Sequence, residues 1–171
     1  MSRSRHLQGF RCACCGKSHK HAPTDMGFQL PDCAWDLAAS ERELHLVAND
    51  DFCAIDKTRF FIRGVVRVPF VHINGYFGWG LWVEVSKNDF FHYHNQLDPQ
   101  SQPFNGRIAN GLPGYPTLIE KPVEARPELS NLRPTLWFPP TARHLLAREQ
   151  KSGIGQARHF EMIHENIPDA L

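Results

Sequence analysis

Residues 51–86 read DFCAIDKTRFFIRGVVRVPFVHINGYFGWGLWVEVS and form the longest run with strand character in the chain. Between positions 60 and 70 every second residue is apolar or glycine, namely Phe60, Ile62, Gly64, Val66, Val68 and Phe70. The residues between them include Arg63 and Arg67. Because side chains alternate between the two faces of a strand, this pattern predicts one buried face and one partly solvated face.

The same period of two continues in the next run. One side carries Trp79, Leu81, Val83 and Val85, and the other carries Gly80, Trp82, Glu84 and Ser86. Two such runs joined by a glycine-containing loop predict adjacent antiparallel strands at about 59–70 and about 77–86. We expect Trp82 to pack in the core or on a sheet face, whereas an exposed Trp82 would line an aromatic binding groove.

Length and composition indicate an ordinary globular domain. The chain has 171 residues, 42% hydrophobic and 22% charged, which suits one domain with a buried core. The net charge of +1 provides no overall field toward nucleic acid or membranes, and no apolar run is long enough to span a bilayer. The N-terminus lacks the apolar core of a secretory signal, so we expect a cytoplasmic protein. We expect residues 1–10 to form a flexible tail and residues 11–171 a single domain.

The other patterns predict short elements around the central sheet. Helices are predicted from Pro31-Asp32, at 87–97 with Ser86 as N-cap, from an N-cap at Thr141 to a stop at Gly153, and at 155–166. Strands are predicted in the second part of 41–50, near 117–125 and near 132–138, with Pro122 and Pro134 confining the last two to edges or bulges. The predicted fold class is therefore α+β: a mostly antiparallel, twisted sheet flanked by a few helices.

The cysteines cluster in the first third of the chain, at Cys12, Cys14, Cys15, Cys33 and Cys53. In a reducing cytosol such clustering favours metal or redox chemistry over disulfides. Cys12 and Cys15 form a C-x-x-C pair, a spacing at which two thiolates can bind one ion about 2.3 Å from each sulfur. Thiolates favour zinc among the common cytosolic metals. His19 or His21 could supply the third ligand, and Cys53 is the best candidate for the fourth.

We therefore predict a structural zinc ion bound by Cys12, Cys15, His19 and Cys53, in an N-terminal segment that resembles a zinc knuckle. Two other interpretations stay open: a loose segment without metal, and a redox dithiol, although redox pairs usually follow a strand at a helix start. A catalytic zinc would need an open coordination position and a proton shuttle, for which the acids flanking Cys53 are available. Sites with three thiolates are mostly closed and structural.

The first 21 residues are basic. They carry Arg3, Arg5, Arg11, Lys17 and Lys20 and no acidic residue. A basic zinc knuckle could contact nucleic-acid phosphates. A solvated tail agrees better with the nearly neutral chain.

Several short motifs occur in order between residues 11 and 165. They are C-x-x-C-G followed by His19, Cys53-Ala-Ile-Asp56, Phe60-Phe61-Ile62-Arg63-Gly64, Phe77-Gly78-Trp79-Gly80-Leu81-Trp82-Val83, Leu112-Pro113-Gly114-Tyr115-Pro116, and Leu145, Ala147, Glu149 and Gln150 with Gly153-Ile154. In these motifs the chain resembles the bacterial DUF2199 family, whose function is unknown. The resemblance implies a single-domain bacterial protein and supplies no activity.

The resemblance also bears on individual residues. The cysteines that match the family pattern are Cys12, Cys15 and Cys53, which agrees with the ligands chosen from spacing. Cys14 and Cys33 fall outside it, so we expect a free thiol and a small buried hydrophobe. The pattern also groups Asp56 with Arg63, which we interpret as a charge-assisted ion pair at a hairpin.

For function, we expect a non-enzymatic binding or adaptor protein with a structural zinc ion and a protein partner, because no catalytic motif occurs in the sequence. One alternative is a metal-dependent hydrolase, which requires an open zinc position. The other is a nucleic-acid-binding protein that uses the basic N-terminal knuckle.

Overall fold

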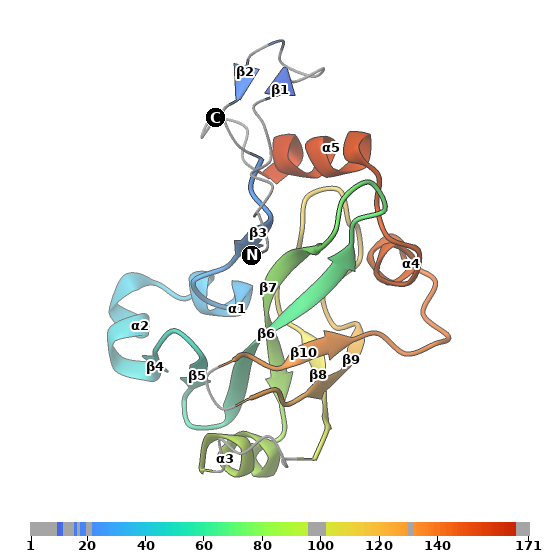
Figure 1. Cartoon of the computed structure of the whole chain (residues 1–171). Helices are drawn as coiled ribbons and strands as arrows, with labels where there is room; N and C mark the ends of the chain where they lie inside the picture. The colour runs from blue at the N-terminus through green and yellow to red at the C-terminus, as the bar shows by residue number, and fades with distance from the viewer. Residues whose placement is uncertain are drawn as a thin grey trace.

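Five strands close into a small barrel in the computed structural model of the chain (Figure 1). The structure describes residues 10–11, 16, 18–19, 22–95, 102–129 and 132–166. The barrel strands are β6 (Arg59–Pro69), β7 (Tyr76–Val85), β8 (Phe104–Ile108), β9 (Pro122–Arg126) and β10 (Thr135–Trp137). Each strand pairs antiparallel with the next along the chain, and β10 returns to lie parallel to β6.

The barrel closes where Thr135 of β10 pairs with Val65 of β6. The N–H of Val65 donates to the carbonyl of Pro134 over 2.9 Å. A β-carbon on Gly64 would lie only 2.6 Å from Cδ2 of Leu136. Glycine at position 64 therefore permits the close approach that closure requires.

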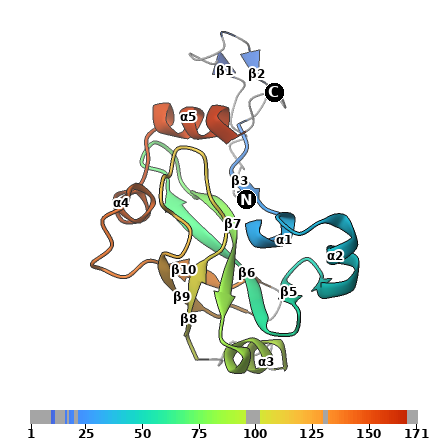
Figure 2. The same cartoon turned by 180° about the vertical axis from the view of Figure 1, so that it is seen from behind.

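Three short strands extend the sheet beyond the barrel. β3 (Asp25–Gly27) lies parallel to β7. β5 (Phe52–Ile55) pairs antiparallel with the first residues of β6, and β4 (Leu46–Ala48) pairs with β5. A separate two-stranded sheet of β1 (Phe10–Arg11) and β2 (Ser18–His19) lies beyond α5, at the opposite end of the molecule from α3 (Figures 1 and 2).

The helices lie around the barrel and at its ends. They are α1 (Asp32–Trp35), α2 (Ala39–His45), α3 (Lys87–Asn95), α4 (Leu145–Ser152) and α5 (Gln156–Asn166). α3 lies at one end of the barrel, while α5 crosses near the other (Figures 1 and 2). In the part of the chain that the structure describes, no helix has the length and apolar character needed to cross a bilayer.

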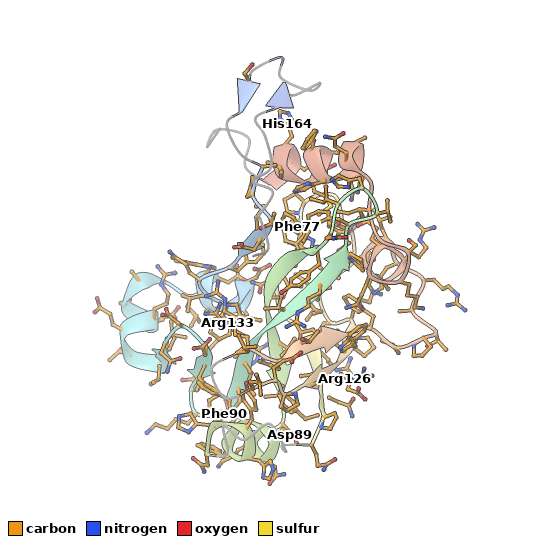
Figure 3. All side chains as sticks on the ribbon, in the orientation of Figure 1. Phe77, Asp89, Phe90, Arg126, Arg133 and His164 are labelled. Carbon is orange, nitrogen blue, oxygen red and sulfur yellow. The ribbon has the colours of Figure 1, made fainter. Side chains whose placement is uncertain are left out.

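The barrel interior is the main core, and its composition confirms the alternation predicted for β6. All six residues of the predicted buried face, Phe60, Ile62, Gly64, Val66, Val68 and Phe70, are buried. Phe90 of α3 contacts Phe60 with ring centroids 5.1 Å apart, and His159 of α5 contacts Phe77 at 5.6 Å. Phe90 and Phe77 thus belong to opposite ends of one apolar interior (Figure 3).

A second, smaller apolar cluster lies outside the barrel, beneath α1 and β5. Cys53, Phe61 and Trp82 are fully enclosed in it. The indole Nε1 of Trp82 donates to the carbonyl of Phe28 over 3.0 Å. Trp82 therefore packs on a covered sheet face, and the alternative of an exposed aromatic groove at this residue is wrong.

Buried polar side chains attach the surrounding elements to the barrel. Gln150 of α4 donates to the carbonyl of Leu136 over 2.7 Å and accepts from the N–H of Phe138 over 3.1 Å. Asn110 accepts from the N–H of Trp82 over 2.8 Å. These side chains provide hydrogen-bond partners for buried backbone groups of Leu136, Phe138 and Trp82. A buried backbone group without a partner would destabilise the fold.

The predicted class is confirmed in its mixture of helices with a mostly antiparallel sheet, but the open, flanked sheet is wrong. Because β10 pairs with both β9 and β6, the strands expected at sheet edges lie inside a closed ring. Both prolines fit into the closed barrel although neither lies on a sheet edge. Pro122 is the first residue of β9, and Pro134 precedes β10 and accepts a hydrogen bond at its carbonyl from Val65. Neither position needs the N–H that proline lacks.

The predicted helices are present, but α2 (Ala39–His45) was not predicted and one cap was misplaced. Ser86 caps α3 as expected, since its hydroxyl accepts from the N–H of Asp89 over 3.0 Å. α4 begins later than predicted: its N-cap is His144, whose Nδ1 accepts from the N–H of Ala147, and not Thr141. Gly153, with φ of 76°, ends α4 as expected.

Candidate functional site

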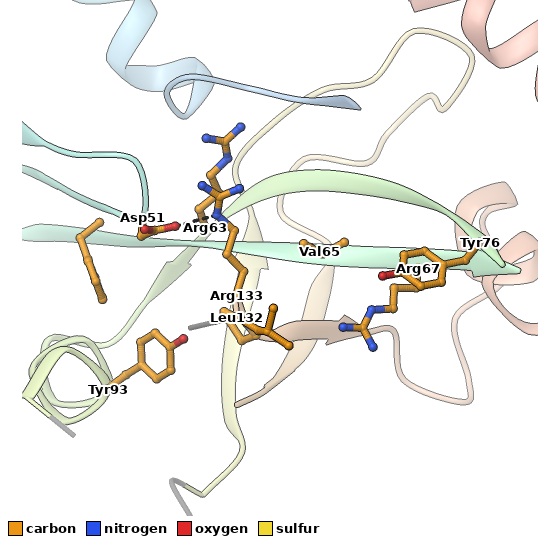
Figure 4. Close-up of a pocket in the computed structure, with 10 residues that line it drawn as sticks. Asp51, Arg63, Val65, Arg67, Tyr76, Tyr93, Leu132 and Arg133 are labelled. Carbon is orange, nitrogen blue, oxygen red and sulfur yellow. Dashed lines mark hydrogen bonds and ion pairs between the residues drawn. The ribbon is translucent and has the colours of Figure 1, made fainter. Parts of the chain in front are cut away.

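A cleft of about 480 Å³ opens over the outer face of β6 (Figure 4). We call it the arginine cleft. Its described lining consists of Asp51, Phe52, Arg63, Val65, Arg67, Tyr76, Tyr93, Leu132, Arg133 and Pro134. The volume lies in the range of sites that bind small molecules.

A second hollow of about 560 Å³ continues from the arginine cleft toward β3, and we call it the glycine lobe. The two share Arg63, Val65, Tyr76 and Arg133. The glycine lobe is lined in addition by Thr24, Asp25, Met26, Gly27, Phe70, Ile73, Asn74, Gly75, Gly78 and Gly80. The shared arginines therefore stand at the boundary between the two spaces.

The fold brings the three arginines together from distant parts of the chain. Arg63 and Arg67 lie on the outer face of β6, since side chains four residues apart on a strand point the same way. Arg133 immediately precedes Pro134 and β10. Parallel pairing of β10 with β6 then brings Arg133 beside Arg63, as Figure 4 shows.

Two of these arginines already have carboxylate partners. Nε of Arg133 donates to Asp51 over 2.6 Å, and its Nη2 lies 3.3 Å from the carbonyl of Asp50. Nη1 of Arg67 lies 3.4 Å from Glu128, and its guanidinium lies over the ring of Tyr76 at 5.1 Å. The four charged side chains are between 31% and 49% exposed. Solvent therefore screens these ion pairs, and they add little to stability.

Arg63 has no carboxylate partner within ion-pair distance in the described part of the chain. Its Nη1 is 3.4 Å from the carbonyl of Asp50, which is a long hydrogen bond, and its buried Nε has no partner among the described residues. Burial, together with the nearby charge of Arg133, lowers the pKa of the Arg63 guanidinium below its usual range, although the charges of Asp51 and Asp50 act in the opposite direction. Since a guanidinium stays protonated in proteins, Arg63 is a cation without a carboxylate partner among the described residues, and its buried Nε has no acceptor there.

Two glycines make room for Arg63. A β-carbon on Gly27 would lie 2.6 Å from its Nη2, and one on Gly80 would lie 3.7 Å from its Nε. The guanidinium therefore lies across β7 and β3 at positions where neither strand has a side chain. This holds Arg63 close to the sheet and turns it toward the cleft.

The chemistry that these residues offer is charge and hydrogen bonding. An arginine guanidinium presents paired N–H groups that match the two oxygens of a carboxylate or phosphate. Of the described residues lining the arginine cleft and the glycine lobe, none is histidine, cysteine or serine. The arrangement is suited to holding an anion.

The ion pair predicted between Asp56 and Arg63 is replaced by other partners. Asp56 lies in the turn after β5 and pairs with Nδ1 of His45 over 2.6 Å. The β5–β6 register places Ile55 opposite Arg59, so Arg63 lies four residues farther along β6, roughly 13 Å away at strand spacing. Arg63 is thus a site residue, but for a different reason from the one predicted.

The predicted zinc ligands lie largely beyond the described residues. Cys12, Cys15 and His21 are outside them, and so is Cys14; only the backbone of His19 is placed, in β2. Cys53 is buried in β5, and burial raises the pKa of its thiol to about 12. Within the described ranges, no group of three or more His, Cys, Asp and Glu side chains is placed to hold a metal ion.

Cys53 and the N-terminal sheet occupy different regions. β2 lies beyond α5, whereas β5 lies beside β4 and α2 (Figure 1). Cys33, expected to be buried, is half-buried. Cys33 and the buried Cys53 both have free thiols, not disulfides. The zinc site remains a prediction from the sequence.

The sequence identified Arg63 and Arg67 as part of a partly solvated strand face, and Arg63 also as an ion-pair partner of Asp56. It did not identify Arg133, Asp51 and Tyr93 as lining residues. The alternation on β6 was the available signal for Arg63 and Arg67. Arg133 carried no signal of its own, because its position depends on how the barrel closes.

Comparison with known proteins adds one finding. The family model described as "Uncharacterized protein conserved in bacteria (DUF2199)" matches residues 11–154, which include all barrel strands and α4. The search of curated proteins gave no match, and neither did the search of solved structures.

Proposed function

Since the chain belongs to the DUF2199 family of uncharacterised bacterial proteins, whose description names no activity, we propose a function from the geometry alone. The protein is a non-enzymatic binding protein that holds a small oxyanion-bearing ligand in the arginine cleft. The observation that carries this proposal is the guanidinium of Arg63 at the wall of a cleft of about 480 Å³, because its buried Nε has no acceptor among the described residues and it has no carboxylate partner there.

Binding an oxyanion would provide hydrogen-bond acceptors for N–H groups of Arg63 and Arg133. A carboxylate or phosphate oxygen near Arg63 would accept charge-assisted hydrogen bonds, which are roughly twice as strong as neutral ones. Arg133 uses Nε and Nη2 for Asp51 and the Asp50 carbonyl, which leaves its Nη1 to turn toward the same ligand. Two guanidinium groups would then share one anion, and their mutual repulsion would be relieved.

We also propose a structural zinc ion at Cys12, Cys15, His19 and Cys53, in a protein of the cytoplasm. The C-x-x-C spacing supports the first two ligands. Cys53 has the least support of the four, because it is enclosed by apolar neighbours such as Phe61 and its high pKa favours the neutral thiol. The zinc ion would stabilise the N-terminal segment and take no part in anion binding.

Anion binding can be tested by thermal denaturation and isothermal titration calorimetry with inorganic phosphate and acetate at low ionic strength. The wild type is expected to gain stability as either anion is added, because a ligand that binds only the folded state raises the free energy of unfolding. Arg63→Gln should lose this gain. The matched control is Arg107→Gln, which removes an exposed arginine on β8 that forms a 4.0 Å contact with Glu120.

The melting temperature without anion shows whether each variant folds. A gain for Arg63→Gln that equals that of the wild type and of Arg107→Gln would show that anions bind elsewhere, and would reject the arginine cleft as the site.

A further inference from the structure

We infer that the ligand of the arginine cleft carries a single carboxylate on an apolar, ring-sized group; this rests on the proposed function and specifies its ligand class. Three features of the cleft point to it: the balance of charge, the guanidinium pair and the apolar wall.

The charge balance favours one negative charge. Asp51 pairs with Arg133, and Glu128 pairs with Arg67. Of the three arginines, Arg63 is therefore the one without a carboxylate partner among the described residues. A monoanion would neutralise Arg63. A phosphate dianion would bring a second negative charge close to Asp51, and the two like charges would repel each other.

The two guanidinium groups define where the charged end of the ligand lies. Arg63 and Arg133 reach the same side of the cleft from β6 and from the segment before β10 (Figure 4). Their charges are close enough for Arg133 to lower the pKa of Arg63. A planar carboxylate can present one oxygen to each guanidinium, whereas a neutral amide offers a single carbonyl oxygen and an ammonium group offers no acceptor.

The rest of the arginine cleft is an apolar wall beside this charged point. It consists of Phe52, Val65, Leu132 and Pro134, with Tyr93 directing its hydroxyl toward Arg133 and Leu132 (Figure 4). Leu132 is 47% exposed, so a bound apolar group would remove its side chain from water. Removal of apolar surface from water favours binding in proportion to the area removed.

The glycine lobe is less suited to the apolar part of the ligand. Its described lining includes Thr24, Asp25 and Asn74, and Asp25 would repel a carboxylate placed deeper in that direction. The apolar group therefore extends from Arg63 toward Phe52 and Leu132.

The inference can be tested by calorimetry with four probes on the full chain: 3-phenylpropanoate, its neutral amide 3-phenylpropanamide, phenyl phosphate and acetate. We expect 3-phenylpropanoate to bind at least about tenfold more tightly than each of the other three. Arg63→Gln should reduce its affinity to that of the amide.

The apolar wall is tested separately with Leu132→Ser. This change should weaken 3-phenylpropanoate severalfold and leave acetate unchanged, because acetate does not reach the wall. Leu129→Ser is the matched control, since Leu129 is 62% exposed and is not among the lining residues.

Each contrary result has a distinct meaning. Phenyl phosphate binding as tightly as 3-phenylpropanoate would overturn the single carboxylate, and acetate binding as tightly would overturn the apolar group. Either result would leave anion binding at Arg63 intact. If neither these probes nor inorganic phosphate binds in a manner that depends on Arg63, the proposed function falls together with this inference.

Discussion

Gly27 and Arg63 are in direct contact although they belong to different strands on either side of β7. A β-carbon on Gly27 would lie 2.6 Å from Nη2 of Arg63, well inside the van der Waals separation of about 3.5 Å. A β-carbon on the neighbouring Gly80 would lie 3.7 Å from Nε of the same guanidinium, an ordinary contact distance. Arg63 therefore keeps its position because Gly27 has no side chain.

Gly27→Ala is expected to displace the guanidinium of Arg63 without unfolding the protein. The nearest atom that the new methyl group meets is the flexible end of a side chain, and the next is the carbonyl oxygen of Gly80 at 3.3 Å. The backbone contact is tight but needs only a small shift, so the free energy of unfolding should fall by about 1 kcal/mol. Affinity for acetate should fall by about tenfold or more, because misplacing one cation removes a charge-assisted contact. Calorimetry gives the affinity, and urea denaturation gives the stability.

The control for Gly27→Ala is Gly155→Ala, where an added β-carbon meets nothing within 4 Å. This variant should bind acetate as the wild type does. If Gly27→Ala also binds acetate normally, the contact with Arg63 has no role in anion binding.

Gly64→Ala tests the closure of the barrel. The added methyl group would lie 2.6 Å from Cδ2 of Leu136 and 3.0 Å from the carbonyl oxygen of Pro134. Neither neighbour can move away freely, because Leu136 is fully buried and the Pro134 carbonyl accepts from Val65. Overpacking of this kind costs about 1 to 3 kcal/mol, measurable as a lower urea midpoint. An unchanged midpoint would contradict the close approach of β10 to β6.

The sequence predicted those parts of the fold that depend on local pattern. The period of two identified the strands β6 and β7 and the inward face of β6, although β7 is buried on both faces over residues 77–83. Ser86 marked the start of α3. Closure was not predictable in this way, because β10 has only three residues and its pairing with Val65 joins segments about seventy positions apart. The position of Arg133 in the cleft follows from that pairing, so the site could be predicted only in part.

His159 is expected to make stability fall in mild acid. Its side chain is fully buried, its Nε2 lies 2.8 Å from the carbonyl of Pro23, and its Nδ1 has no partner among the described residues. Burial lowers the pKa of the His159 imidazole below its usual range, and the nearby His72 acts in the same direction. Protonation at Nδ1 would add a buried N–H donor that has no acceptor among the described residues.

The sign follows from linkage. The folded state favours neutral His159, so its contribution is fully present above the pKa of an unfolded histidine, near 6.5, and is lost as the pH falls below that value toward the lowered folded-state pKa. The free energy of unfolding should decrease between about pH 7.5 and about pH 5. Each tenfold difference in proton affinity between the unfolded and the folded protein contributes about 1.4 kcal/mol to this decrease.

His159→Gln keeps a donor for the Pro23 carbonyl but cannot be protonated in this range. Urea denaturation at both pH values should show a smaller decrease for this variant than for the wild type. His92→Gln, at an exposed position on α3, should keep the full decrease. Equal pH dependence in wild type and His159→Gln would assign the decrease to other groups.

Removal of zinc is expected to destabilise the protein. Binding of structural zinc is worth about 10 to 16 kcal/mol in small zinc peptides, which is comparable with the net stability of a whole domain, about 5 to 15 kcal/mol. A chelator should therefore lower the melting temperature and release about one zinc ion per chain, measured by elemental analysis. Cys12→Ser and Cys15→Ser should each have the same effect, and a chelator should then cause no further loss.

The zinc content of variants distinguishes ligands from residues that only pack, because a stability loss alone does not. Cys14→Ser, at a position outside the predicted ligand set, should retain zinc and the wild-type melting temperature. Cys53→Ala will destabilise the protein in either case, since it leaves a cavity beside Phe61 and Trp82. If Cys53 is the fourth ligand, this variant also loses zinc; if zinc is retained, another residue completes the site. A melting temperature unaffected by chelator, in protein that contains no metal, would reject the zinc site altogether.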